Sequence, residues 1–82
     1  MPRYYFHSAD RSRDPDQEGT ELASEEEAQR MAVAFAGTVL KDDPGGLWAK
    51  GMWRVEVTDE TNTLLFTVIT MTVDAPRPRR ER

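Results

Sequence analysis

The amino-acid sequence predicts an α+β fold, in which a three-stranded antiparallel sheet carries one α-helix across one face. Three observations support this prediction. Residues 24–43 have the spacing of an amphipathic helix, residues 52–58 alternate between apolar and polar side chains, and residues 64–73 are mostly β-branched. Residues 20–22 offer a short fourth strand at the sheet edge, before the helix. A sheet and a helix that each have one apolar face are both satisfied by two packed layers.

The helix has start and stop signals. Ser24 followed three residues later by Glu27 is a capping box, in which each side chain accepts a hydrogen bond from a free backbone N–H group. Residues 44–46, Pro-Gly-Gly, are predicted to end the helix. Its apolar stripe is rich in alanine, which allows close approach to a sheet or, alternatively, to the same helix of a second copy. The stripe comprises Ala28, Met31, Ala32, Phe35, Val39 and Leu40.

The first strand is expected at residues 3–8, which are rich in aromatic side chains. Because side chains alternate across a strand, Tyr4 and Phe6 share one face, which we assign to the core. Tyr5 and His7 then share the opposite face, where we expect His7 to lie at the sheet surface.

Two connections are expected on either side of the helix. Residues 9–19 are polar and are predicted to form a loop or a weak hairpin arm. Residues 45–51 are predicted to be a loop in which Trp48 folds back over the rim of the core, because so large an aromatic side chain is seldom left in water.

The last two strands are predicted to form an antiparallel hairpin with Asn62 in its turn, since asparagine tolerates a positive φ. With the tip at residues 61–62, Val57 opposes Phe66, and the next inward pair is Val55 and Val68. A different turn length would shift the register by one residue and turn the other face of the last strand inward. We prefer the first register.

The preferred register leaves apolar side chains on the face away from the helix. Either a loop or the tail covers them, or they form a surface for a second copy or another protein. The candidate partner-facing residues are Tyr5, His7, Leu65, Ile69 and Met71.

The charge of the chain is unevenly distributed. Residues 76–82 contain four arginines and one glutamate, so they carry a charge of +3. Since the net charge of the chain is −4, the remaining residues carry −7. An acidic body repels phosphates, so nucleic-acid binding is unlikely except through residues 77–82. We expect one domain at residues 1–75 and a disordered tail at residues 76–82.

Composition limits the chemistry and the location. There is no cysteine among the 82 residues, which excludes disulfides and thiol catalysis. We found no signal-peptide pattern and no apolar run that crosses a membrane, and therefore expect a cytoplasmic protein. His7 is the only histidine and stands in no recognisable catalytic motif, so we expect no enzymatic activity and no cofactor.

The acidic stretch before the helix contains a calcium-loop spacing. Asp14, Asp16, Glu18, Gly19 and Glu25 occupy loop positions 1, 3, 5, 6 and 12. Glutamate is longer than the usual ligand at position 5, and no helix precedes the stretch. A solvated acidic loop is therefore the preferred interpretation, with a weak calcium site as the alternative.

Residues 1–7, residues 18–22 before the alanine-rich helix, and residues 55–60 resemble a family of short uncharacterised alphaproteobacterial proteins. That family is classed as a domain of unknown function and opens on a Pro-Arg-Tyr-Phe-Phe-His type strand. The resemblance spans residues 1–73 and implies a strand–helix–strand–strand domain with no known activity. The family has Asp-Gly turns where this chain has Asp10-Arg11 and Thr61-Asn62, which leaves the first hairpin open.

From these patterns we expect a non-enzymatic interaction module that self-associates through the open face of its sheet, with a protein partner as the alternative to a homodimer. A second possibility is an acidic decoy that inhibits a nucleic-acid-binding protein through its carboxylates. A third is a calcium-responsive domain.

Overall fold

The computed structural model describes residues 1–10 and 13–78. Within them it contains two helices and an antiparallel sheet of five strands. The elements are β1 (Arg3–Ala9), β2 (Arg13–Asp14), β3 (Thr20–Glu21), α1 (Glu25–Asp42), α2 (Pro44–Lys50), β4 (Met52–Thr58) and β5 (Leu64–Met71). The α+β class and the antiparallel sheet are confirmed, but the sequence predicted one helix and three or four strands.

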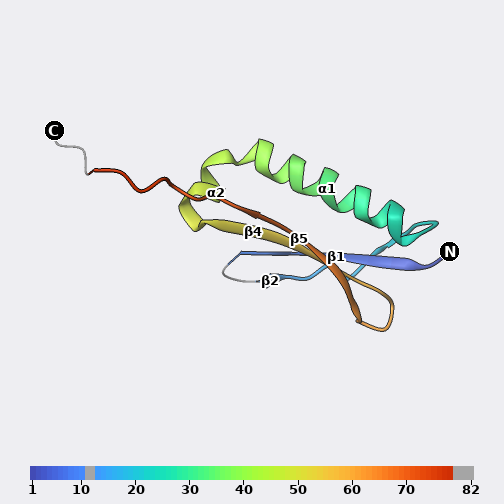
Figure 1. The fold of residues 1–82 in the computed structure, drawn as a ribbon. Coiled ribbons are helices and arrows are strands. Elements are labelled where there is room, and N and C mark those ends of the chain that lie inside the picture. The colour runs from blue at the N-terminus through green and yellow to red at the C-terminus, as the bar shows by residue number, and fades with distance from the viewer. Residues whose placement is uncertain (11–12, 79–82) are drawn as a thin grey trace.

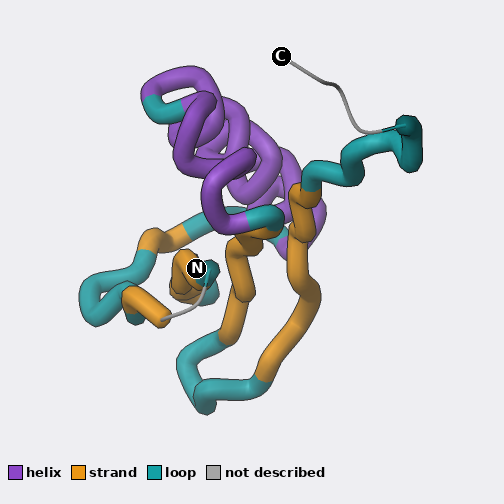
Figure 2. The backbone as a smooth tube through the Cα atoms, turned by 90° about the vertical axis from the view of Figure 1, so that its left-hand side faces the viewer, coloured by secondary structure: helices purple, strands orange, loops and turns teal. Residues whose placement is uncertain are grey.

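The strand order is β2-β1-β4-β5, and β3 pairs with β1 beside β2. Both helices lie on one side of this sheet (Figures 1 and 2). The expected strand at residues 20–22 is present as β3, and of the two alternatives for residues 9–19 the weak hairpin arm is present as β2. It consists of two residues, Arg13 and Asp14, that pair with Ala9 and Ser8, and so short a pairing leaves no alternating pattern in the sequence.

The start of α1 follows the predicted capping box with one difference. Ser24 is the N-cap, and its Oγ accepts a hydrogen bond from the Glu27 backbone N–H at 3.2 Å. Glu27 Oε2 accepts from the Ala23 backbone N–H at 3.3 Å, one residue before the expected donor. The buried stripe consists of alanines, Ala28, Ala32 and Ala36, so the backbone of α1 lies close to the sheet.

The connection after α1 differs from the prediction. α1 ends at Asp42, before Pro44, as predicted, but most of the expected loop at residues 45–51 is helical. Pro44 begins α2, because proline lacks an N–H group that the first helical residue does not need. Asp43 caps this helix: its Oδ1 accepts from the Gly46 backbone N–H at 3.2 Å. Trp48 then lies on the outer side of α2 and is 65% exposed, so the prediction that it covers the core rim is wrong.

The hairpin of β4 and β5 has the preferred register. Val57 pairs with Phe66 and Val55 with Val68, and an irregularity follows between Val57 and Thr58. Asn62 has a φ of 64°, as expected for the turn. Val55 and Val57 are completely buried beneath α1, in one cluster with Tyr4, Leu22, Ala28 and Ala32.

The end of the described chain lies outside helices and strands. Residues 74–78 are exposed and extend away from the body of the domain (Figure 1). The remaining part of the expected disordered tail, residues 79–82, falls outside the described residues.

Candidate functional site

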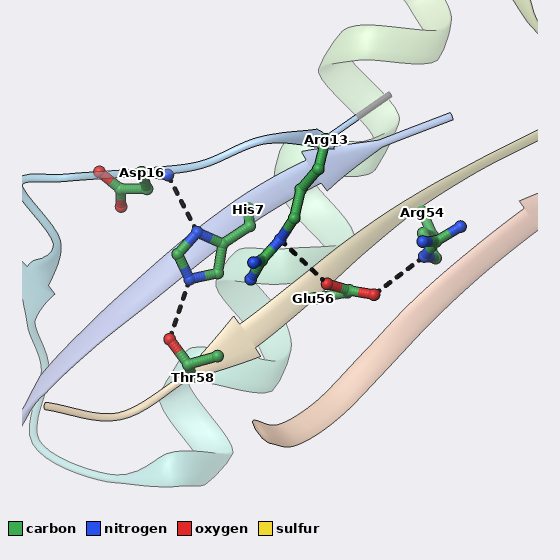
Figure 3. A network of polar contacts seen from close by, with 6 residues as sticks. All are labelled: His7, Arg13, Asp16, Arg54, Glu56 and Thr58. Carbon is green, nitrogen blue, oxygen red and sulfur yellow. Dashed lines mark hydrogen bonds and ion pairs between the residues drawn. The ribbon is translucent and has the colours of Figure 1, made fainter. Parts of the chain in front are cut away.

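The face of the sheet opposite the helices carries a row of charged side chains. Arg13 Nε lies 3.3 Å from Glu56 Oε1, and Arg54 Nε lies 3.0 Å from Glu56 Oε2 (Figure 3). β4 places Arg54 and Glu56 on one face because they are two positions apart in the strand, and β2 brings Arg13 alongside. The open face therefore carries an ion-paired layer over β2 and β4, which the sequence analysis did not anticipate.

His7 lies beside this layer and is buried, with 6% of its surface exposed. The Asp16 backbone N–H donates to His7 Nδ1 at 3.0 Å, so Nδ1 is an acceptor and the proton of the neutral ring lies on Nε2. His7 Nε2 then donates to Thr58 Oγ1 at 2.9 Å (Figure 3). The expectation that His7 lies at the sheet surface is wrong, because the segment around Asp16 closes over the edge of β1.

The surroundings of His7 favour its neutral form. Burial and the nearby Arg13 guanidinium lower the pKa of His7 below its usual 6.5, although Asp16 and Glu56 act in the opposite direction. Tyr5 stacks along the imidazole at a ring-centroid distance of 6.4 Å. With both nitrogens occupied, His7 acts as a structural bridge between the loop and β4, and in this tautomer it does not serve as a general base toward Thr58.

Asp16 organises the acidic segment. Its Oδ1 accepts from the backbone N–H groups of Glu18 and Gly19 at 3.0 and 3.1 Å, and its Oδ2 accepts from the Phe6 N–H at 3.2 Å. Burial raises the pKa of Asp16, but these backbone donors and His7 outweigh it, so the pKa lies below its usual value. The charged Asp16 side chain therefore links the loop to β1 by hydrogen bonds to both.

The four candidate calcium ligands are used differently. Asp16 is engaged by backbone donors, Asp14 is an exposed residue of β2, Glu18 is exposed in the loop, and Glu25 is the first residue of α1. Across residues 1–10 and 13–78, no group of three or more carboxylates or imidazoles is arranged to hold a metal ion. The loop spacing thus did not translate into a ligand cluster.

The acidic surface proposed for a decoy is partly neutralised. Glu21 pairs with Arg3 at 3.0 Å, and Glu26 pairs with Arg30 at 2.7 Å. Glu27 and Asp16 accept hydrogen bonds from backbone N–H groups. These carboxylates serve the domain's own loop and helix start.

The three β5 candidates separate into two groups. Ile69 and Met71 are 58% and 61% exposed, whereas Leu65 is half-buried and packs against the core cluster. β5 is also the last strand of the sheet, so the backbone groups along its outer edge have no strand partner within the described part of the chain. The exposed apolar residues and the free edge therefore coincide on one element.

Sequence reasoning missed the network of Arg13, Glu56 and Arg54 and the bridge from His7 to Thr58. The alternation of β4 did place Arg54, Glu56 and Thr58 on one face. The contribution of Arg13 had no sequence signal, since it depends on the fold bringing β2 back beside β1.

Comparisons with known proteins were made once this geometry was established. The sequence model of a family described as a domain of unknown function, DUF6894, matches residues 3–72. No curated protein and no solved structure matches the chain. In the described residues, neither helix has the length and apolar character needed to cross a membrane.

Proposed function

The chain belongs to the DUF6894 family, and on that premise we propose that it is a non-enzymatic interaction module that self-associates through the outer side of its sheet. The observation that carries this proposal is β5, in which Ile69 and Met71 are exposed beside an unpaired strand edge. Exposed apolar residues next to free backbone donors and acceptors are the usual composition of a strand-pairing interface.

The position of the charged layer supports this choice within the open face. Arg13 and Arg54 both pair with Glu56, so burying these three side chains against a second copy would cost desolvation with little new attraction. Ile69 and Met71 lie on the outermost strand, beyond this layer. Self-association is therefore stabilised most by burying the exposed apolar residues of β5, and little by burying the charged residues beside β1.

The absence of enzymatic activity is part of the proposal. His7 is the best candidate for acid–base chemistry in the chain, and both of its ring nitrogens are occupied by Asp16 and Thr58. A buried imidazole with two internal partners has no free nitrogen to offer to a substrate.

The test is the solution mass by light scattering, measured on the full chain and on a chain that ends at Ala75. We expect dimers of both, since β5 precedes the shortened end. Ile69→Lys should shift the protein to monomer because it places a charge on the strand, whereas Val73→Lys, a matched change of an exposed apolar residue beyond β5, should leave the mass unchanged. Monomers of both chains at all concentrations would refute the proposal.

A further inference from the structure

From Phe66 to Met71, the outer edge of β5 lacks the protection that sheet edges usually have. Leu64–Met71 contains no charged residue and no proline. The irregularity of the hairpin inserts Leu65 into β5, because Val57 pairs with Phe66 whereas Thr58 pairs with Leu64, so the strand is regular from Phe66 to Met71. Native proteins commonly place lysine, proline or a bulge on an exposed edge to prevent pairing. Residues 66–71 have none of these features, so this part of the edge is suited to accept another strand.

Resting on the proposed function, we propose that the strand added at this edge is β5 of a second copy, antiparallel, with the two-fold axis at Val68. An axis through a residue keeps side chains of the same face opposite one another. Ile69 then opposes the partner's Thr67, and Phe66 opposes the partner's Thr70. A residue near a two-fold axis lies next to the same residue of the other copy. A charged side chain there would be repelled by its own copy, whereas the uncharged side chains of β5 are compatible with each other.

The position of α1 makes such a pair fit together above the sheet. α1 packs on β4 and β5, so it lies over the half of the sheet that ends at the outer edge of β5. Strands are about 4.8 Å apart, so a helix above the line between β4 and β5 lies about 5 Å from an axis just outside β5. The two copies of α1 would then be about 10 Å apart, which is the upper end of the usual helix-packing distance.

The flank of α1 that would face the axis is suitable for contact. Met31 and Phe35 line a groove with Phe6 of β1, so they mark the opposite flank. Val33 lies two residues after Met31, about 200° around the helix, and is 60% exposed. One turn later, a Cβ added to Gly37 would meet nothing within 4 Å, which leaves room for close approach.

Charge complementarity favours a second copy as the occupant. Paired β5 strands related by a two-fold axis carry their α1 helices antiparallel. The acidic first turn of one helix, residues 25–27, then lies toward the last turn of the other, where Lys41 is the basic residue. Val33 is near the middle of α1 and Val68 is near the middle of β5, so we place Val33 close to the proposed axis.

Single cysteines test the pairing, because the full chain contains no cysteine of its own. Val68→Cys should form a disulfide-linked dimer under mild oxidation, since residues directly opposite across antiparallel strands are within bonding distance. Ile69→Cys is the matched control. In the proposed register the two copies of residue 69 are offset by two positions along the strands, so their Cα atoms are about 8 Å apart and beyond the reach of a disulfide. An equal mixture of Thr67→Cys and Ile69→Cys proteins should cross-link to each other, because these positions are opposite in the proposed register.

A helix variant tests the second contact. Val33→Arg should weaken the dimer at least tenfold in sedimentation, whereas Thr38→Arg, an exposed position on the other flank of α1, should not. A dimer in which Val68→Cys cross-links no faster than Ile69→Cys would overturn this arrangement and leave the proposed self-association standing. A monomer at all concentrations would overturn both.

Discussion

Replacing Asp16 with asparagine isolates the contribution of the carboxylate that joins the acidic loop to β1. In the native domain two oxygens accept three backbone N–H bonds, from Phe6, Glu18 and Gly19. Asparagine keeps one acceptor oxygen, so either the Phe6 N–H or the two loop N–H groups face an amide N–H₂ donor instead. Since a hydrogen bond to a charged group contributes about 1.5–3 kcal/mol, we expect a loss of about 2 kcal/mol of unfolding free energy.

The loss is measurable by thermal and urea unfolding of the two proteins. For a domain of this size, about 2 kcal/mol corresponds to a fall in Tm of about 8–16 °C. Asp14→Asn is the matched control, because Asp14 lies two positions before Asp16 and the change removes the same charge. The Asp14 carboxylate is exposed, and no hydrogen bond to it from another described residue is assigned. We expect the Tm of this control to stay within about 2 °C of wild type, since surface changes seldom exceed about 0.5 kcal/mol.

The dependence on pH provides a second readout. The folded-state pKa of Asp16 is lowered from 3.8, so its charge stabilises the domain above about pH 4, and this contribution is lost as the pH falls through the folded-state pKa. The difference between wild type and Asp16→Asn should therefore shrink in acid. Equal stability of Asp16→Asn and Asp14→Asn at neutral pH would refute the role assigned to the Asp16 carboxylate.

Three further predictions concern His7, Ser24 and Gly19. Because burial lowers the pKa of His7 below 6.5, the unfolded chain binds a proton more readily, and the unfolding free energy should fall as the pH drops below 6.5. Urea unfolding across this range should show a weaker dependence of the unfolding free energy on pH for His7→Asn than for wild type. An equal pH dependence of the two proteins would contradict the assignment. Ser24→Ala removes the α1 cap and should cost about 1 kcal/mol in urea unfolding, with Ser24→Asn close to wild type as its control. Gly19→Ala should cost more than about 1 kcal/mol in the same assay, because φ is +73° and the new Cβ would lie 2.8 Å from Arg3 Cγ; Gly45→Ala, where a Cβ meets nothing, is the comparison.

Local patterns in the chain were sufficient for the elements whose stability is local. The capping box at Ser24 and Glu27 places the start of α1, and the alternation around Val55 and Val57 places β4 and its buried face. Asn62 marks the hairpin turn, and with it the register. In each case the determining interactions lie within a few residues, or follow from the period of one element.

The remaining features depend on contacts between residues far apart in the sequence. His7 alternates with Phe6 in a strand, and this alternation predicts that it faces solvent. Its burial comes from Asp16 and Thr58, which lie 9 and 51 residues away. The pairing of Arg13 with Glu56 has the same origin, since two charges at that separation have no reason to meet until β2 lies beside β1.

The exposure of Trp48 and the free edge of β5 were likewise decided by the tertiary structure. A tryptophan is usually covered, but α2 turns this ring outward because Leu47, one residue earlier, takes the inward position. That β5 is the outermost strand depends on β1 pairing with the other side of β4, a choice between two edges that the strand sequences do not distinguish. Periodicity determines which face of an element is buried, whereas only the assembled sheet determines which edge stays open.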